Sequence, residues 1–234
     1  MKEYLGRAIE QKMHPELFQV GITCMGHLVK IYGKIMEPYM QKLLPFMVES
    51  LADPTMRKET KIHMFFAVAD ISAHCPEATY TNLEKILNLL EMAFSAVLQL
   101  QQIQDQENIQ YTESLKETLI DMMLCIIHGI YYQDVDTPQT QMLREFLPKV
   151  VEFARLTTDK QVNPRMSYNR DVMILLMDIY LKDRNPNLVN HNLLVGLYRD
   201  LSVYNNNPEI QETLNEVKKY LFSDKDPLIQ NNYL

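Results

Sequence analysis

Acidic side chains at helical spacing are the first feature of this sequence that could support a function. Glu113, Glu117 and Asp121 follow one another at intervals of four residues, so on an α-helix they share one face. Like charges at this spacing repel one another, and only Lys116 lies near enough to offset them. Such a row would attract a helix rich in Lys and Arg. The alternative is an ordinary solvated helix face.

A second acidic row lies near the end of the chain. Glu209, Glu212 and Glu216 are separated by three and four residues, which again predicts one helix face. Tyr220 lies four residues further on and could stack on a basic side chain through a cation–π contact. The two acidic rows and Tyr220 are therefore the predicted partner-binding residues.

The other reactive side chains do not form a catalytic or cofactor-binding pattern. The six histidines show no paired-ligand spacing such as HExxH, and no Gly-rich phosphate loop occurs. Cys24, Cys75 and Cys125 lie in apolar stretches without a CxxC pair, which predicts core residues at equivalent repeat positions in a reducing, intracellular compartment. We therefore expect no enzymatic activity, no cofactor and no metal.

The composition excludes several classes of protein. The chain has 234 residues, 47% of them hydrophobic, which is too apolar for an intrinsically disordered protein. It carries 30 acidic and 23 basic residues, and a net charge of −7 argues against a nucleic-acid binder. No apolar run approaches the roughly 18 residues that a membrane span needs.

The elements that would position these residues are helices. Apolar residues recur at intervals of three and four, and Pro residues separate the periodic stretches. No stretch shows the alternation of a strand. We predict an all-α fold with helices near 2–12, 15–33, 38–51, 56–74, 79–100, 112–132, 139–156, 165–182, 188–202 and 208–222. The polar segment 101–110 is predicted to be an insert between two helices.

An internal repeat suggests how these helices are arranged. The segment Leu44–Glu49 recurs as Leu147–Glu152, with a Pro at the second position of both. Helix pairs that repeat about every 40–47 residues are typical of HEAT and armadillo proteins. We predict a right-handed α-α superhelix, a solenoid of about five helical hairpins over residues 1–222, followed by a tail at 223–234. The alternative is a single irregular helix bundle.

Two aspartates interrupt apolar helix runs in this pattern. Asp70 and Asp178 each follow a small or apolar residue in the middle of a predicted helix. A carboxylate in such a place needs a partner. We expect each to bond to a neighbouring repeat.

The order of these features resembles a known family. The stretch Met56–Met92 has a basic start, an Ala-Asp dipeptide within the helix, Tyr80 near a turn and then a long amphipathic helix. A second block begins at Tyr111 and continues to Gly129. Both are similar to the C-terminal part of importin beta, the karyopherin family of nuclear import receptors. The resemblance extends over residues 14–222 in one register.

The resemblance implies a set of partners. It implies that the chain is the last part of a longer superhelix, which binds the basic N-terminal segment of importin alpha or other basic cargo. Most Ran-GTP contacts would lie in the missing N-terminal repeats, and no nucleic acid or membrane would be bound. A secondary surface for FG nucleoporins would be an apolar groove between neighbouring first helices, involving Phe46, Leu87 and Phe94. The implied location is the cytoplasm and nucleus, including the nuclear envelope and pore.

The sequence departs from the family in its aromatic residues. Family members stack tryptophans on basic side chains, whereas this chain has no Trp. Tyr198, Tyr204 or Tyr220 would have to serve instead. The remaining alternatives are a HEAT scaffold outside transport, such as a phosphatase regulatory subunit or a trafficking adaptor, and a helical enzyme, for which no polar constellation is present.

Overall fold

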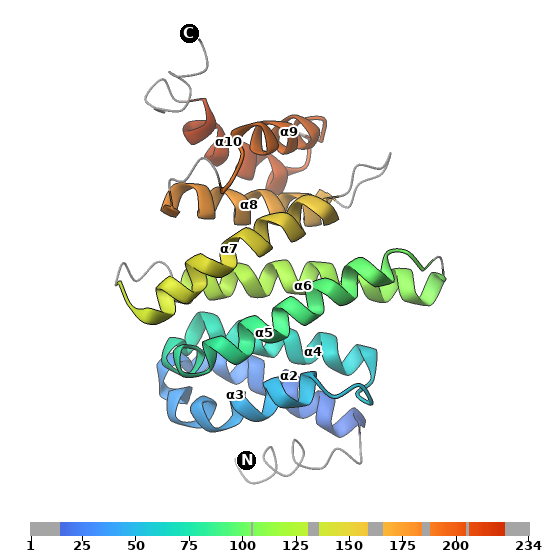
Figure 1. Cartoon of the computed structure of the whole chain (residues 1–234), viewed down its shortest axis with the longest axis vertical. Helices are drawn as coiled ribbons and strands as arrows, with labels where there is room; N and C mark the ends of the chain where they lie inside the picture. The colour runs from blue at the N-terminus through green and yellow to red at the C-terminus, as the bar shows by residue number, and fades with distance from the viewer. Residues whose placement is uncertain are drawn as a thin grey trace. The chain divides into compact units, whose positions relative to one another are not determined.

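Helices form the regular structure of the chain (Figure 1). The computed structural model describes residues 15–103, 105–130, 136–158, 166–183, 188–204 and 206–222, and within these ranges no strand occurs. The helices are α2 (Pro15–Tyr32), the 3-10 helix η1 (Gly33–Met36), α3 (Glu37–Leu51), α4 (Lys58–His74), α5 (Pro76–Leu100), α6 (Gln106–Ile130), α7 (Pro138–Thr157), α8 (Met166–Asp183), α9 (His191–Ser202) and α10 (Pro208–Leu221). The all-α prediction is confirmed. The helix predicted near 2–12 lies outside the described residues.

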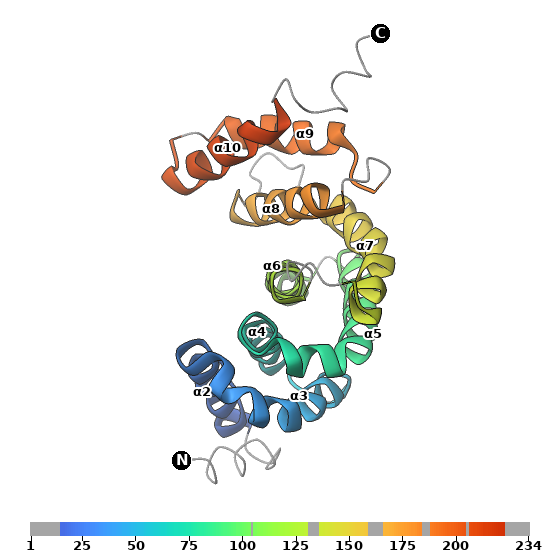
Figure 2. The same ribbon diagram turned by 90° about the vertical axis from the view of Figure 1, so that its left-hand side faces the viewer.

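The chain divides into two compact units, Met1–Phe146 and Leu147–Leu234, with the boundary inside α7. In the first unit, α2, α4 and α6 pack side by side as one layer, and α3 and α5 pack as a second layer (Figure 2). In the second unit, α9 packs against both α8 and α10. In the order of the predicted hairpins, α3, α5, α7 and α9 are first helices, and α2, α4, α6, α8 and α10 are second helices.

The core of the first unit consists of the apolar rows that the sequence predicts. The row on α5 is almost completely shielded from water, because α5 packs against α3, α4 and α6. Each such aliphatic side chain stabilises the fold by about 1.5–3 kcal/mol relative to an exposed position. Its most deeply buried members are Leu83, Ile86, Leu90 and Val97.

Two glycines allow the second helices to approach one another closely. A Cβ atom on Gly129 of α6 would lie 2.2 Å from the backbone oxygen of Ser72 on α4, which is shorter than any contact a carbon atom tolerates. A Cβ atom on Gly26 of α2 would lie 2.8 Å from Oδ2 of Asp70 on α4. Because glycine has no side chain, the neighbouring helices of this layer lie closer together than a larger residue at either position would allow.

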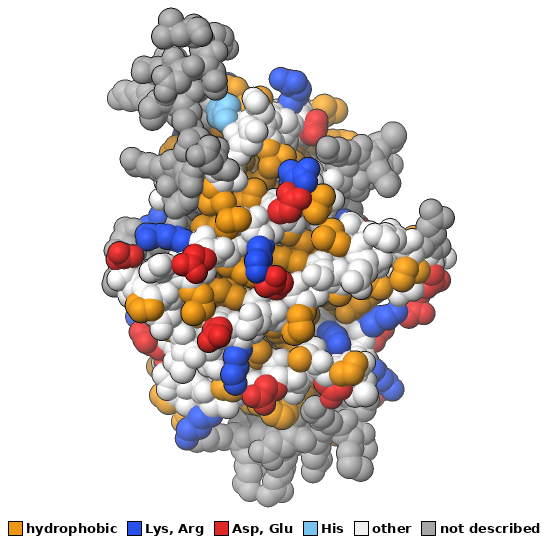
Figure 3. All heavy atoms as spheres, viewed as in Figure 1, with side chains coloured by type: hydrophobic (Ala, Val, Ile, Leu, Met, Phe, Trp, Pro, Cys, Tyr) orange, Lys and Arg blue, Asp and Glu red, His pale blue; other side chains and the backbone are white. Residues whose placement is uncertain are grey.

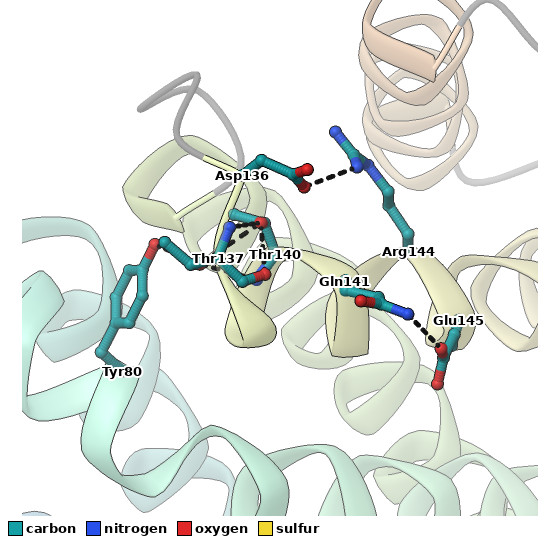
Figure 4. Close-up of polar contacts among 7 residues, drawn as sticks. All are labelled: Tyr80, Asp136, Thr137, Thr140, Gln141, Arg144 and Glu145. Atoms are coloured by element: carbon teal, nitrogen blue, oxygen red, sulfur yellow. Dashed lines mark hydrogen bonds and ion pairs between the residues drawn. The ribbon is translucent and has the colours of Figure 1, made fainter.

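The start of α7 is fixed by a reciprocal cap (Figure 4). The backbone N–H of Thr137 donates to Oγ1 of Thr140 at 2.8 Å, and the N–H of Thr140 donates to Oγ1 of Thr137 at 3.1 Å. Two amide groups that lack helical partners are satisfied in this way. The hydroxyl groups of Tyr80 and Thr137 lie 3.2 Å apart, which connects α5 to this cap.

The repeated prolines occupy the interiors of two first helices. Pro45 lies inside α3 and Pro148 inside α7, as the internal repeat predicts. A proline cannot donate the backbone hydrogen bond that a helix interior requires, so its presence is costly. Its recurrence in first helices supports a shared hairpin structure.

Three helix starts differ from the sequence prediction. α6 begins at Gln106, so half of the predicted insert 101–110 is helical. Gln and Glu are good helix formers, and Lys58 at the start of α4 bonds to Glu107 and Asn108.

The starts of α5 and α9 also differ from the prediction. α5 begins earlier, at Pro76, because a proline in the first turn of a helix loses no hydrogen bond through its lack of a backbone N–H. α9 begins later, because the side chain of Asn190 caps it.

Candidate partner-binding surfaces

The acidic row near the C-terminus lies on the solvent-facing side of α10. The opposite side of this helix is buried through four apolar residues, Ile210, Leu214, Val217 and Leu221. Glu209, Glu212 and Glu216 are all exposed, and Tyr220 continues the same side with 46% of its surface exposed. Four of the predicted binding residues thus share one accessible surface, which we call the α10 face.

Two carboxylates of the α10 face already have basic neighbours. Glu209 forms an ion pair with Arg170 of α8, and Glu216 forms one with Lys219 of α10. The hydrogen bond from Lys219 to Glu216 raises the pKa of Lys219. The three side chains of Glu209, Glu216 and Lys219 are more than half exposed, and exposed ion pairs of this kind contribute little to stability. Both carboxylates remain largely open to solvent.

The other acidic row lies along the narrow strip of α6 that reaches water. Most of α6 is buried between α4 and α5, whereas Glu117 is half-buried and Asp121 is exposed. α6 is the second helix of its hairpin, as predicted. We call the strip carrying Glu117 and Asp121 the α6 strip.

Glu113 differs from the other members of its row. Its two carboxylate oxygens accept hydrogen bonds from Nζ of Lys116 at 2.9 and 3.0 Å. The Lys116 side chain is only 4% exposed, so its charge depends on this carboxylate for compensation. Glu113 thus stabilises the helix internally and offers little charge to a partner.

An ion pair joins the second-helix layer beside the α6 strip. Nζ of Lys30 on α2 lies 2.9 Å from Oδ1 of Asp70 on α4. The hydrogen bond to Asp70 raises the pKa of Lys30, and the negative charge of Asp121 on α6 acts in the same direction. The prediction that Asp70 bonds to a neighbouring repeat is confirmed. Asp178 is half-buried in α8.

The cysteines do not occupy equivalent positions, and the prediction that all three belong to the core is wrong for Cys24. Cys24 is exposed on α2, because it lies on the side of that helix opposite its packed residues. Cys75 is buried between α4 and α5, and burial raises its pKa to about 11. Burial, with the charges of Asp121 and Asp70, raises the pKa of Cys125 to about 12.

The aromatic residues expected at partner surfaces divide into core and exposed groups. Phe94 stacks on Phe146 with ring centroids 6.0 Å apart and is 5% exposed, and Leu87 is 4% exposed. Leu87 and Phe94 are therefore core residues, whereas Phe46 of α3 is half-buried. Tyr198 packs edge-on against Phe222, whereas Tyr220 presents its ring to solvent.

The second unit contains a groove between two first helices whose lining residues the sequence does not predict. It lies within the second unit, between α7 and the segment that leads into α9, and encloses about 520 Å³. Its lining is largely apolar, with the Glu152–Arg155 ion pair of α7 at its side. The lining residues are Pro148, Val151, Glu152, Arg155, Leu188, Asn190 and Leu193. The sequence predicts a groove between first helices but not this one, because residues so far apart carry no joint signal.

The surface over α3 and α5 has a different character. Figure 3 shows acidic and basic side chains interspersed with apolar ones on this side of the molecule. Mixed charge of this kind creates no field of a single sign. The α10 face and the α6 strip are therefore the better candidates for a basic partner.

Comparison with protein families shows which helical-repeat family this chain resembles. The chain matches the family model described as importin subunit beta-1-like, TPR repeats, over residues 1–197. The chain belongs to the importin subunit beta-1-like family. The stacked hairpins of this importin-beta-like chain are the helical repeats of that family, which confirms the resemblance seen in the sequence. No curated protein and no solved structure matches the chain closely enough to report.

Two structural features are absent from the described part of this importin-beta-like chain, a cluster of potential metal ligands and a membrane-spanning helix. In the residues that the structure places, no group of three or more His, Cys, Asp or Glu side chains could hold a metal ion. None of the helices placed there is long and apolar enough to cross a bilayer.

Proposed function

We propose that this chain is a segment of a nuclear import receptor that binds a basic helix, such as the N-terminal segment of importin alpha. The observation that carries the proposal is the α10 face, where three exposed carboxylates and an exposed tyrosine share one side of a second helix. Carboxylates attract Lys and Arg side chains, and the tyrosine ring provides a surface for one of them. The proposed site of action is the cytoplasm and nucleus, with passage through the nuclear pore.

The α6 strip supports the same function within the first unit. Glu117 and Asp121 lie on it, and Glu113 remains a member of the predicted row although Lys116 engages its carboxylate. The ion pairs on the α10 face involve exposed carboxylates, so each is weak against a second cation. Binding is therefore expected to be electrostatic and to weaken as salt increases.

The experiment is a titration of a Lys/Arg-rich amphipathic peptide at low and moderate salt, with binding followed by fluorescence anisotropy. The triple variant Glu209→Gln, Glu212→Gln, Glu216→Gln should weaken binding about tenfold, since each carboxylate contributes roughly 0.5 kcal/mol. The matched control replaces two exposed carboxylates of α5, Glu84→Gln and Glu91→Gln, and should bind as the unmodified chain does. Salt-independent binding, or equal loss in the control, would rule out the proposal.

The groove between α7 and α9 favours a second candidate function. An apolar groove of about 520 Å³ can accept the ring of a phenylalanine, so it suits the FG segments of nucleoporins, whereas Leu87 and Phe94 are buried. Leu193→Ser should weaken binding of a Phe-Gly peptide without changing the binding of the basic peptide. A peptide with Ser in place of Phe should not bind; equal binding of both peptides would exclude the groove as an FG site.

A further inference from the structure

Phe66 is an exposed aromatic residue in the middle of α4, a second helix of the first unit. It is 42% exposed, whereas its neighbours Met64, Phe65 and Ala67 are buried. A single exposed apolar residue is common on protein surfaces, so the charges around the ring decide what it can bind. Those charges come from α4 itself and from its neighbours α2 and α6.

The exposure of Phe66 does not depend on what precedes or follows the chain. α4 packs against α2 on one side and α6 on the other, and α3 and α5 lie behind it (Figure 2). Phe66 lies on the side of α4 that none of these four helices covers. A repeat before α2 would contact its own neighbouring hairpin and would leave this side of α4 open.

α4 and α6 lie side by side and run in the same direction. Nζ of Lys58, at the start of α4, lies 3.1 Å from Oε1 of Glu107, at the start of α6. Near the other ends, Gly129 of α6 approaches the backbone of Ser72 on α4 so closely that no side chain fits between them. The middle of α4, which carries Phe66, therefore lies beside the middle of α6.

Acidic side chains flank the ring in this arrangement. Burial raises the pKa of Cys125, and the charges of Asp121 and Asp70 raise it further, so these two carboxylates lie near one another across the α4–α6 contact. Phe66 lies about one turn before Asp70 on α4, and Glu117 lies about one turn before Asp121 on α6. The ring is therefore set beside the α6 strip.

The charges around Phe66 leave a negative surface despite one internal ion pair. Nζ of Lys30 lies 2.9 Å from Oδ1 of Asp70, so these two charges compensate each other. Glu117 and Asp121 then give the surface two more negative than positive charges. A basic partner is the one that this surface complements.

We propose that Phe66 binds an arginine side chain of the basic partner in preference to lysine, which rests on the proposed function and names the residue type that it selects. The face of an aromatic ring attracts a cation, and a planar guanidinium group can stack on it while donating hydrogen bonds to carboxylates beside it. An ammonium group is compact and more strongly hydrated, so it gains less from the ring. Phe66 thus provides an aromatic surface far from Tyr198, Tyr204 and Tyr220 in the sequence.

The test compares two basic helical peptides that differ only in carrying Arg or Lys at every basic position. Binding is followed by fluorescence anisotropy at low salt in full chains that also carry Tyr220→Leu, so that Tyr220 of the α10 face contributes no ring. Phe66→Leu should weaken binding of the arginine peptide about two- to fivefold and change the lysine peptide little. Phe66→Tyr, which keeps a ring, should retain the preference for arginine.

A control and a second readout separate recognition from a structural effect. Tyr39→Leu replaces a ring of similar exposure, 41%, on the first helix α3, and should not change the ratio of the two affinities. In NMR spectra of the bound arginine peptide, protons next to a guanidinium group should shift upfield through the ring current of Phe66. Phe66→Leu should abolish that shift.

The outcomes distinguish this inference from the proposed function on which it rests. Equal weakening of both peptides by Phe66→Leu, or a preference for arginine that survives this substitution unchanged, would overturn the role of Phe66 while the chain still bound basic helices. Failure of both peptides to bind the unmodified chain at low salt would overturn the proposed function and the role of Phe66 together.

Discussion

Replacing Gly129 with Ala should destabilise the first unit by an amount that follows from one distance. The new Cβ atom would lie 2.2 Å from the backbone oxygen of Ser72, so α6 and α4 must separate by about 1 Å to restore a normal contact. Overpacking against a backbone atom costs roughly 1–3 kcal/mol or more, and alanine returns about 1 kcal/mol through its higher helix propensity. We expect a net loss of about 1–2 kcal/mol and a fall in melting temperature of about 3–8 °C.

The control for this substitution is Gly196→Ala in α9. Nothing lies within 4 Å of the Cβ position of Gly196, so only the propensity term acts and the second unit should gain about 0.5–1 kcal/mol. Urea unfolding gives the two free energies, and amide hydrogen exchange assigns each change to its own helices. Stabilisation by Gly129→Ala, or equal effects at both sites, would refute the claim that a missing side chain sets the spacing of α4 and α6.

Three further outcomes are expected. Thr137→Val removes an acceptor from the cap of α7 and should cost about 1 kcal/mol in urea unfolding, whereas Gln141→Ala, on the exposed side of the same turn, should cost much less. Lys58→Ala removes the bonds that hold the start of α6 and should speed amide exchange at residues 106–110 while the rest of α6 stays protected; uniform exchange would contradict this role. Burial raises the pKa of Cys125 from 9.0 to about 12, so the folded chain retains a proton that the unfolded chain loses. Stability should therefore fall as pH rises from about 9 to 12, and Cys125→Ala should reduce that slope in urea unfolding at pH 8 and 10.5.

Much of the fold is encoded in local patterns that a single sequence reveals. The rows on α5 and α10, the repeated prolines and the proline breaks between helices all depend on spacing within one element. Spacing therefore predicted that Glu209, Glu212, Glu216 and Tyr220 share one side of a helix. Their role in binding stays a prediction.

The parts that spacing could not predict depend on contacts between elements. The first turns of α6 are mostly polar, and Lys58 from α4 bonds to two of their side chains. Cys24 follows the same apolar periodicity as a core residue, but its side of α2 has no neighbour in the described chain. The groove between α7 and α9 combines residues some forty positions apart, and only the fold brings them together.

The most direct test of the central claim is a hydrogen-exchange footprint of the full chain with and without a saturating Lys/Arg-rich helical peptide at low salt. The account predicts slower exchange in α10 around Glu209–Tyr220 and in α6 around Glu117 and Asp121, with both effects reversed by added salt. Protection confined to α3 and α5, or no protection at saturation, would contradict the claim that the acidic second helices bind a basic partner.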